Sequence, residues 1–395
     1  MSSVLVINSG SSSFKYQLID AESEQRLASG LVERIGDSTG HATHETPEGQ
    51  WERSLEIPDH TAGFGVMTDA FREHGPSLDE HPPVAVGHRV VHGGARFFEP
   101  TLVTPLVLIN IEDLSELAPL HNPPNVEGIK AAMQVFPELP QVAVFDTAFH
   151  QTMPPDAYTY ALEGSVAERL RIRRYGFHGT SHKYVSEAAA RFVQRPLTEL
   201  KQLVLHLGNG ASVCAIDRGR SVDTSMGFTP LEGLVMGTRT GDIDPAVLLY
   251  LQRKTRIGVD ALDDLLNKQS GVLGISGHQD MRDLTAAADA GDEKARLALG
   301  VYVHRIKHYV GAYLAELGGA DLITFTAGVG ENSAIVRARA LSGLEGLGIE
   351  IDPDRNDAPN RGPRVISTDA SRTTVLVVPT NEELEIARQT LQVAT

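Results

Sequence analysis

Short apolar runs separated by small polar residues open the chain and recur near its middle. Residues 4–7 are apolar and β-prone, residues 8–13 are rich in serine and glycine, and residues 14–19 resume the apolar pattern. The same order of apolar run, glycine turn and second apolar run occupies residues 203–216. Each stretch predicts two strands joined by a turn. Two such copies indicate two related halves that face each other across a cleft.

The turn formed by Gly208, Asn209 and Gly210 has little side-chain bulk, so a ligand can approach its backbone amides closely. Glycine also tolerates positive φ. Successive amide groups form a concavity that binds anions such as phosphate. The turn is therefore a candidate phosphate site, and an ordinary tight turn without a ligand is the alternative.

Apolar runs elsewhere predict buried strands that alternate with amphipathic helices, as in α/β proteins. Arg89 then lies at the end of a buried strand, and Asp146 follows another strand at its carboxyl end, where ligands bind in open α/β sheets. Besides the two hairpins, we expect strands at residues 26–32, 84–91, 142–145, 322–325 and 375–378, and helices at residues 126–136, 184–193 and 293–317, from 245 onward and from 382 onward.

Two stretches carry weaker patterns. The polar stretch at residues 36–50 predicts a loop or a frayed ribbon. Residues 327–330 predict a glycine turn, followed by a helix from Glu331 onward. A strand, a glycine loop and a helix N-terminus together can bind an anion or a nucleotide.

The chain is long enough for two domains, because a single core for 395 residues would be unusually large. A proline-containing break at residues 153–156 follows the last strand of the first half. We therefore predict domains at residues 1–150 and 151–382, with a helix at about residues 383–395 that packs back on the first domain.

The composition is that of a soluble globular protein, with 41% hydrophobic and 22% charged residues. A net charge of −16 argues against nucleic acid or an anionic membrane as the main partner, so any site for an anion must be locally basic. We find no signal peptide and no run near the ~18 apolar residues of a membrane span. The single cysteine, Cys214, excludes an intramolecular disulfide and, with these features, predicts a cytoplasmic protein. Cys214 lies in a predicted strand, which favours a buried core residue over a nucleophile.

The sequence lacks the common nucleotide-binding motifs. No Gly-x-x-x-x-Gly-Lys-Ser/Thr occurs, and neither glycine pair completes a Gly-x-Gly-x-x-Gly motif, because Val213 and Ser333 occupy the third position. The protein-kinase motifs are also missing. Any phosphate-binding elements are therefore hairpin turns and strand-to-helix loops.

Eight short motifs, in order along nearly the whole chain, resemble those of the acetate kinase family, within the broader superfamily of sugar kinases, Hsp70 and actin. Three of them are His88-Arg-Val-Val-His-Gly-Gly94, Gly176-Phe-His-Gly-Thr-Ser-His182 and Phe325-Thr-Ala-Gly-Val-Gly-Glu-Asn332. One such motif is a weak signal, whereas eight in family order are specific. The other five lie at residues 6–15, 145–150, 206–210, 237–245 and 379–383.

This resemblance implies two duplicated ribonuclease H-like domains of βββαβαβα order, with ATP and acetate in the cleft between them. It implies direct in-line transfer of the γ-phosphoryl group of ATP to acetate, which reversibly gives acetyl phosphate and ADP. The expected metal is Mg²⁺, with Mn²⁺ as an alternative. The resemblance also implies a homodimer.

The resemblance implies catalytic roles for Asp146, His178 and Arg239. Arg239 contacts the transferring group, and His178 donates a hydrogen bond to its equatorial oxygens in the transition state. A structural loop histidine is the alternative for His178. Acetate at neutral pH is already a carboxylate and needs no general base. We therefore predict that Asp146 orients Arg239 or a metal-bound water.

The same resemblance implies the residues that bind the two substrates. Arg89 grips the acetate carboxylate, Lys15 lies near the polyphosphate, and His121 is a weaker candidate for the role of His178. The methyl group of acetate lies in an apolar pocket of Val91, Leu120, Phe177 and Pro230. The predicted ATP contacts are His206, Leu207, Gly208, Asn209, Gly210, Asp280, Met281, Arg282, Gly328, Val329, Gly330, Glu331 and Asn332.

Asn8 and Glu382 match the magnesium positions of the family, and oxygen ligands of this kind suit Mg²⁺. Glu383 is the neighbouring alternative, and Glu382 is otherwise explained as a carboxylate at a helix N-terminus. His88 and His92 are spaced i,i+4, but the β-branched residues between them favour an extended segment, so we do not expect joint metal ligation.

Two other functions remain open at this point. A propionate or butyrate kinase of the same fold is one, because an extra methylene changes discrimination by only ~1–3 kcal/mol. An Hsp70-like ATPase without a small acceptor is the other. Arg89 and the apolar pocket favour a kinase, since a chaperone ATPase needs no clamp for a carboxylate.

Overall fold

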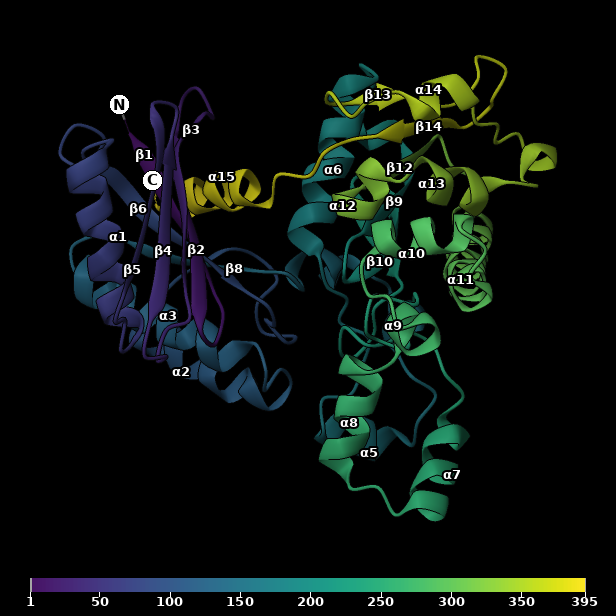
Figure 1. Ribbon diagram of the computed structural model, residues 1–395, viewed down its shortest axis with the longest axis horizontal. Coiled ribbons are helices and arrows are strands. Elements are labelled where there is room, and N and C mark those ends of the chain that lie inside the picture. The colour runs from purple at the N-terminus through teal and green to yellow at the C-terminus, as the bar shows by residue number, and fades with distance from the viewer. Residues whose placement is uncertain (1, 395) are drawn as a thin grey trace. The chain divides into compact units, whose positions relative to one another are not determined.

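The computed structural model describes residues 2–394, and residue contacts divide the chain into two compact units (Figure 1). Unit 1 comprises Met1–Phe149 and Asn381–Thr395, and unit 2 comprises His150–Thr380. The sequence-based prediction places these boundaries after residues 150 and 382. The chain thus leaves unit 1 once and returns to it for its last helix.

In the described part of the chain, unit 1 is built on an eight-stranded mixed sheet with β1 (Ser3–Ser9) near its centre. This strand pairs antiparallel with β2 (Ser13–Asp20) and parallel with β6 (Pro83–Val90). Residues 4–7 are buried, as expected for a continuous apolar run covered on both faces. The order is β5-β4-β3-β2-β1-β6-β8-β7, with β3 at Arg26–Glu33, β4 at Gly40–Thr46, β5 at Gly49–Leu55, β7 at Thr101–Leu102 and β8 at Gln141–Phe145.

The stretch predicted as a loop or frayed ribbon is an ordered hairpin of β4 and β5. Gly40, Ala42 and His44 are buried at alternate positions, and glycine and histidine hide this period-2 pattern in the sequence. The His44 ring receives a hydrogen bond from the Tyr16 hydroxyl at 2.7 Å and donates one to the Gly75 carbonyl at 2.6 Å. Side-chain hydrogen bonds thus stabilise a strand with little apolar surface.

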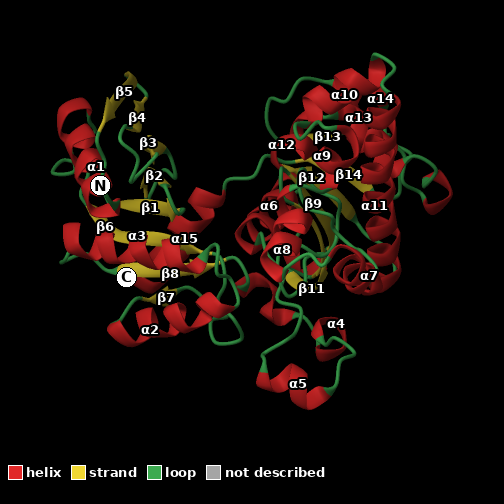
Figure 2. Ribbon diagram, turned by 60° about the horizontal axis from the view of Figure 1, so that its bottom comes forward, coloured by secondary structure: helices red, strands yellow, loops and turns green. Residues whose placement is uncertain are grey.

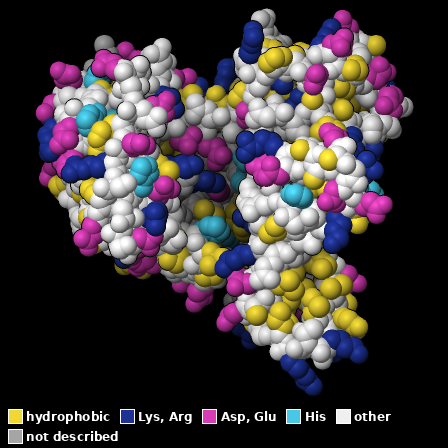
Figure 3. Space-filling model, viewed as in Figure 1, with side chains coloured by type: hydrophobic (Ala, Val, Ile, Leu, Met, Phe, Trp, Pro, Cys, Tyr) yellow, Lys and Arg dark blue, Asp and Glu magenta, His cyan; other side chains and the backbone are white. Residues whose placement is uncertain are grey.

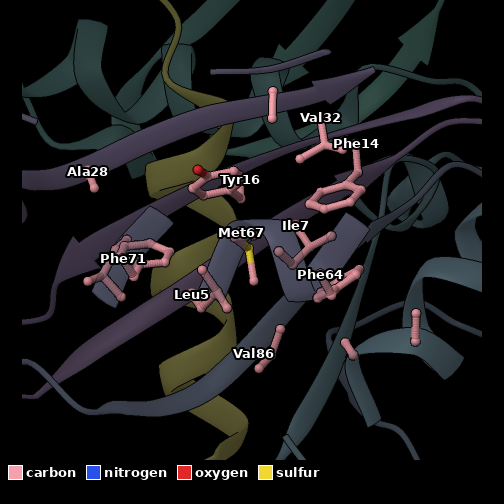
Figure 4. Packing of buried hydrophobic residues seen from close by; sticks show 14 of the residues in the cluster. Leu5, Ile7, Phe14, Tyr16, Ala28, Val32, Phe64, Met67, Phe71 and Val86 are labelled. Atoms are coloured by element: carbon pink, nitrogen blue, oxygen red, sulfur yellow. The ribbon is translucent and has the colours of Figure 1, made fainter. Parts of the chain in front are cut away.

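Helices cover both faces of the unit 1 sheet. On one face, aromatic and aliphatic side chains of β1, β2, α1 and α3 form the core, with Phe14 stacked on Phe64 at 4.6 Å (Figure 4). On the other face, α15 packs on β1, β6 and β8. A Cβ at Gly87 would lie 2.3 Å from Thr390 Oγ1, so α15 requires glycine at this position. The helices of unit 1 are α1 (His60–His74), α2 (Pro105–Asp113), α3 (Asn122–Val135) and α15 (Glu382–Ala394).

Unit 2 repeats this arrangement on a sheet of order β11-β10-β9-β12-β14-β13. Its first five strands in this order correspond to β3-β2-β1-β6-β8 of unit 1, with an antiparallel hairpin followed by parallel strands in both units. The predicted duplicated α/β fold is therefore confirmed. The strands are β9 (Lys201–Leu207), β10 (Ala211–Asp217), β11 (Arg220–Thr224), β12 (Leu322–Thr326), β13 (Arg364–Val365) and β14 (Thr374–Val377).

Helices flank the unit 2 sheet on both faces (Figure 2). The long helix α11 has the predicted bounds, because Asp292 caps its N-terminus and Gly318, with φ 65°, ends it. The helices of unit 2 are α4 (Pro155–Tyr158), α5 (Gly164–Arg169), α6 (Gly179–Phe192), α7 (Pro245–Thr255), α8 (Val259–Lys268), α9 (Gly271–Ser276), α10 (Met281–Asp289), α11 (Glu293–Leu317), α12 (Ala327–Asn332), α13 (Ala334–Leu341) and α14 (Pro353–Asp357).

One of the two predictions about glycine turns is wrong. Residues 327–330 are not a turn, because α12 begins directly after β12; Ala327, with φ 63°, makes the sharp change of direction. The predicted turn at residues 208–210 connects β9 and β10, and none of its residues has positive φ. The glycines of this turn therefore allow a ligand to approach the backbone closely, and the backbone conformation does not require them.

Among the helices of residues 2–394, none combines the length and the apolar character needed to cross a membrane.

Candidate active site

In unit 1, adjacent parallel strands bring Arg89 and Asp146 together. Arg89 lies near the end of β6 and Asp146 directly follows β8. The Arg89 Nε atom lies 3.1 Å from both carboxylate oxygens of Asp146, and Nη2 lies 2.8 Å from Oδ2. Glu382 approaches Nη2 from the start of α15 at 3.6 Å. These three residues form the cluster that we call the arginine cluster.

Burial opposes the charge of Arg89, yet the carboxylates of Asp146 and Glu382 raise its pKa above the ordinary value. The Asp146 side chain is 2% exposed, whereas those of Arg89 and Glu382 are about one-fifth exposed. The guanidinium is thus permanently charged, and its hydrogen bonds to Asp146 fix its orientation. Its Nη1 atom makes no hydrogen bond to the residues that the structure describes, so this nitrogen is available to a ligand.

Sequence reasoning identified Asp146 but not its partner. We predicted that Asp146 orients Arg239 or a metal-bound water, whereas the structure places Arg89 on its carboxylate. A bidentate carboxylate fixes the plane of a guanidinium. Its role toward Arg239 or a metal-bound water stays a prediction.

Two asparagines of α3 hold the loops beside this cluster, and sequence reasoning missed both. Asn122 accepts a hydrogen bond from the His92 amide at 3.0 Å and donates one to the His92 carbonyl at 2.9 Å. Asn125 accepts one from the Val91 amide at 3.1 Å and donates one to the Ser9 carbonyl at 2.7 Å. The available signal was the pair of asparagines that flanks the two prolines at the start of the helix.

The other predicted residues of unit 1 differ in their surroundings. Leu120 is 59% exposed, and Val91 and His121 are partly buried. Asn8 pairs with Lys15 across β1 and β2, and both line a cavity of about 290 Å³ together with Glu383. Glu382 instead faces Arg89, so the two candidate metal carboxylates have different surroundings.

In unit 2, a cavity of about 990 Å³ lies between the β9–β10 turn, α10 and α12. This volume lies near the upper end of the range for ligand pockets, ~300–1,000 Å³. The Tyr302 hydroxyl is buried at the cavity wall and has no hydrogen-bond partner among the described residues, as expected of a wall that meets a polar ligand. The predicted ATP residues that line the cavity are Gly208, Asn209, Asp280, Met281, Arg282, Gly328, Val329 and Asn332.

Five other predicted ATP residues do not line this cavity. His206 and Leu207 are buried in β9, and the carbonyl oxygens of Gly330 and Glu331 accept hydrogen bonds from the buried Arg337. Gly210 lies instead beside His178 and Arg239. Sequence reasoning missed several lining residues, notably His278, Gln279 and Ser333, which belong to none of the eight motifs. It also missed Gly237, which begins the motif at residues 237–245, because a motif does not say which of its residues line a cavity.

Asp280 and Arg282 form an ion pair at the start of α10. The Arg282 Nη2 atom lies 2.7 Å from Asp280 Oδ2, and the Arg282 amide donates to Oδ1 at 2.7 Å. Hydrogen bonds from the Arg282 side chain and amide lower the pKa of Asp280 to about 2. The pair is solvent-exposed and mainly caps the helix.

His178 and Arg239 meet at Gly210. His178 is the N-cap residue of α6, with φ 56°, and its ring stacks on His206 at 4.1 Å. A Cβ at Gly210 would lie 3.5 Å from His178 Nε2 and 3.6 Å from Arg239 Nη1. Burial lowers the pKa of Arg239, whose Nη1 atom donates to the Pro230 carbonyl at 3.0 Å. Two nitrogen donors thus flank a position without a side chain.

The last predicted residue of the acetate pocket, Phe177, is buried next to His178. Its carbonyl accepts a hydrogen bond from His150 Nε2 at 2.9 Å. Burial lowers the pKa of His150 to about 4, so this ring is neutral at pH 7 and its Nδ1 atom accepts from the Ser221 hydroxyl at 2.8 Å.

A duplicated α/β fold, with a nucleotide-sized cavity in one unit and a buttressed arginine in the other, is the arrangement expected of a phosphotransferase. The chain belongs to the acetokinase family, whose model matches residues 3–388. An acetate kinase from Leifsonia xyli subsp. xyli is 66% identical over 392 residues, which cover 99% of both chains. One from Streptomyces coelicolor is 54% identical over 389 residues, which cover 98% of this chain and 96% of the relative.

Solved structures give the same result. The crystal structure of Porphyromonas gingivalis acetate kinase superposes with a TM-score of 0.95 at 42% sequence identity, and both chains are covered completely. A propionate kinase from Francisella tularensis superposes with a TM-score of 0.93 at 43% identity, again over both complete chains. The family is thus shown, and the choice between acetate and a longer acid depends on the substrate pocket.

Proposed function

We propose that this protein transfers the γ-phosphoryl group of ATP to acetate and forms acetyl phosphate and ADP reversibly. The observation that carries this proposal is the arginine cluster, in a chain whose relatives at 53–66% identity are named acetate kinases. A charged guanidinium with one free nitrogen suits a small carboxylate. An Hsp70-like ATPase is not supported, since residues 3–388 match the acetokinase family.

In this proposal, unit 2 binds the nucleotide. The cavity of about 990 Å³ takes ATP, with Asn209 and α12 at its wall. His178 and Arg239 donate hydrogen bonds to the transferring phosphoryl group, whose negative charge is spread over three equatorial oxygens. Acetate attacks as a carboxylate, so no group has to remove a proton. Transfer is direct and in line.

Magnesium fits the charge balance of unit 1. Arg89 contributes one positive charge, and Asp146 and Glu382 contribute two negative charges, so the arginine cluster is formally −1. An anionic substrate needs a further cation there, and Glu382 with Asn8 would supply oxygen ligands to Mg²⁺ or Mn²⁺. The bound metal would neutralise phosphate charge. Glu383, beside Asn8 and Lys15, is the alternative ligand.

Assays with acetate, propionate and butyrate test which acid is the substrate. We expect kcat/KM to be highest for acetate and about 10- to 200-fold lower for propionate, which corresponds to ~1–3 kcal/mol for one methylene. Butyrate should be poorer still. Equal kcat/KM values for acetate and propionate would favour the alternative activity, as in the Francisella tularensis propionate kinase. Hydrolysis of ATP at the same rate with and without any acid would rule out both kinase activities.

We also propose a cytoplasmic homodimer. Exposed hydrophobic side chains gather over α7 and α8 of unit 2 (Figure 3), among them Leu249, Tyr250 and Val259, which are 54–73% exposed. This surface is the first one to test. Light scattering should give the mass of two chains, and Tyr250→Glu should reduce it to the mass of one.

A further inference from the structure

Three histidines, His178 among them, and one serine lie in a row where α6 packs on β9 and contacts Ser212 of β10. Ser212 pairs directly with His206 across the two strands, so their side chains lie on the same face of the sheet. His182 follows His178 by one helical turn and reaches the same face. All four side chains belong to unit 2, and Ser212, His206 and His182 are buried.

We infer that Ser212 and His182 act as positioning residues that keep the proton of neutral His178 on Nε2. The inference rests on the proposed function, in which His178 donates a hydrogen bond to the phosphoryl group. It adds two residues to the site and assigns a tautomer, which decides whether His178 can donate at all. Nothing in the sequence motifs points to Ser212.

The geometry places the Ser212 hydroxyl between two rings. Its Oγ atom lies 2.9 Å from His178 Nδ1 and 2.8 Å from His182 Nε2. A hydroxyl carries one hydrogen, so it donates to one of these nitrogens and accepts from the other. Which ring receives the hydrogen depends on His182.

The surroundings of His182 settle that choice. Its ring is fully buried, and Nδ1 has no hydrogen-bond partner among residues 2–394. A buried N–H without an acceptor is rarer in proteins than an unsatisfied acceptor, so the single proton of the neutral ring is on Nε2. His182 Nε2–H therefore donates to Ser212, and the Ser212 hydroxyl donates to His178 Nδ1. Burial lowers the pKa of His182 well below its ordinary value, in agreement with a neutral ring.

The consequence for His178 is a donor that faces the reacting group. With Nδ1 occupied as an acceptor, the proton of the neutral ring is on Nε2. That nitrogen lies on the side of Gly210, where a Cβ would be 3.5 Å from it and 3.6 Å from Arg239 Nη1. His178 and Arg239 can then donate to the same group.

A neighbouring interaction holds the backbone of His178. His150 Nε2–H donates to the carbonyl of Phe177, the residue before His178. The stacked ring of His206 is in turn held through Nδ1 by Ser181 at 2.8 Å. Packing thus determines the orientation of the His178 ring, and Ser212 determines which of its nitrogens carries the proton.

The tautomer can be read directly by NMR of the intact protein with ¹⁵N-labelled histidine at pH 8, above the ordinary pKa of a histidine side chain. His178→Gln removes one signal and so assigns it. We expect His178 to carry its proton on Nε2 in the unmodified protein and to show both tautomers in Ser212→Ala. A wild-type His178 with its proton on Nδ1 would overturn the inference, whether or not Ser212→Ala folds.

Kinetics supply the second test. Loss of one positioning hydrogen bond should lower kcat of Ser212→Ala about tenfold and leave KM for both substrates nearly unchanged. Ser212→Thr keeps the hydroxyl and should retain more activity. The control Ser186→Ala removes another buried hydroxyl, bonded to the Lys183 carbonyl on α6, and should leave kcat unchanged.

A double-mutant cycle separates positioning from general damage. If Ser212 acts through His178, then His178→Ala with Ser212→Ala has the kcat of His178→Ala alone. A further tenfold loss in the double variant would contradict the inference. Failure of the proposed function can be distinguished from failure of this inference. If the proposed function is wrong, the unmodified protein does not phosphorylate acetate, while the NMR result for His178 still stands.

Discussion

Replacement of Asp146 by asparagine removes the negative charge behind Arg89 and keeps one side-chain oxygen. Asp146 accepts three N–H contacts from Arg89 at 2.8–3.1 Å, and its side chain is 2% exposed. Hydrogen bonds between charged groups contribute about 1.5–3 kcal/mol, against about 0.5–1.5 kcal/mol for neutral ones. A loss of about 1.5–3 kcal/mol in holding Arg89 predicts a kcat/KM for acetate about 10- to 150-fold lower.

The kinetic constants of Asp146→Asn and their pH dependence distinguish two roles of Asp146. A positioning carboxylate supports Arg89, so Asp146→Asn should lower turnover, raise KM for acetate and leave the pH dependence flat. A general base would cost about 10²–10⁴-fold and introduce a new ionisation. The assay is the initial rate of ADP formation from pH 6 to 8, with thermal unfolding to confirm that the variant is folded. A steep new ionisation in the variant would refute the positioning role.

Three further predictions concern other parts of the chain. Gly87→Ala places a Cβ 2.3 Å from Thr390 Oγ1, so it should destabilise unit 1 by about 1–3 kcal/mol; Thr390→Ala should restore part of the lost unfolding free energy in urea. Burial lowers the pKa of His88 and His150 from 6.5 to about 4, so the unfolded state binds more protons between these values. The free energy of unfolding should therefore fall as pH decreases from 6.5 to 4, by up to about 3 kcal/mol per histidine, and His88→Gln should flatten this slope; an unchanged slope would contradict the assignment. Asn209→Ala should raise KM for ATP several-fold more than KM for acetate, because Asn209 lines the unit 2 cavity; the reverse order would contradict this.

Strong local patterns made most of the fold predictable. β1 and β9 are continuous apolar runs, and α11 begins after a capping aspartate and ends at a left-handed glycine, so chain-local physics decides these elements. The hairpin of β4 and β5 has no such pattern, since His44 is buried by hydrogen bonds to Tyr16 and Gly75. The start of α12 was missed because a non-glycine residue, Ala327, makes the turn that the sequence suggested for the glycines.

The candidate site was likewise predictable only in part. Motifs identified Arg89, Asp146, His178 and Arg239, but a motif does not say which side chains touch. The bond between Arg89 and Asp146 depends on the parallel register of β6 and β8, which no local pattern encodes. Ser212 illustrates the limit most clearly. A serine in an apolar strand signals a buried partner, but only the packing of α6 identifies the partners as His178 and His182.

Acyl phosphate formation tests the central claim most directly. The unmodified protein is incubated with ATP, Mg²⁺ and acetate in the presence of hydroxylamine, which converts acetyl phosphate to acetohydroxamate. We predict one acetohydroxamate for each ADP formed, no product without acetate, and a rate that Arg89→Ala abolishes at subsaturating acetate. ADP formation without acetohydroxamate would show that the phosphoryl group goes to water and would contradict the account.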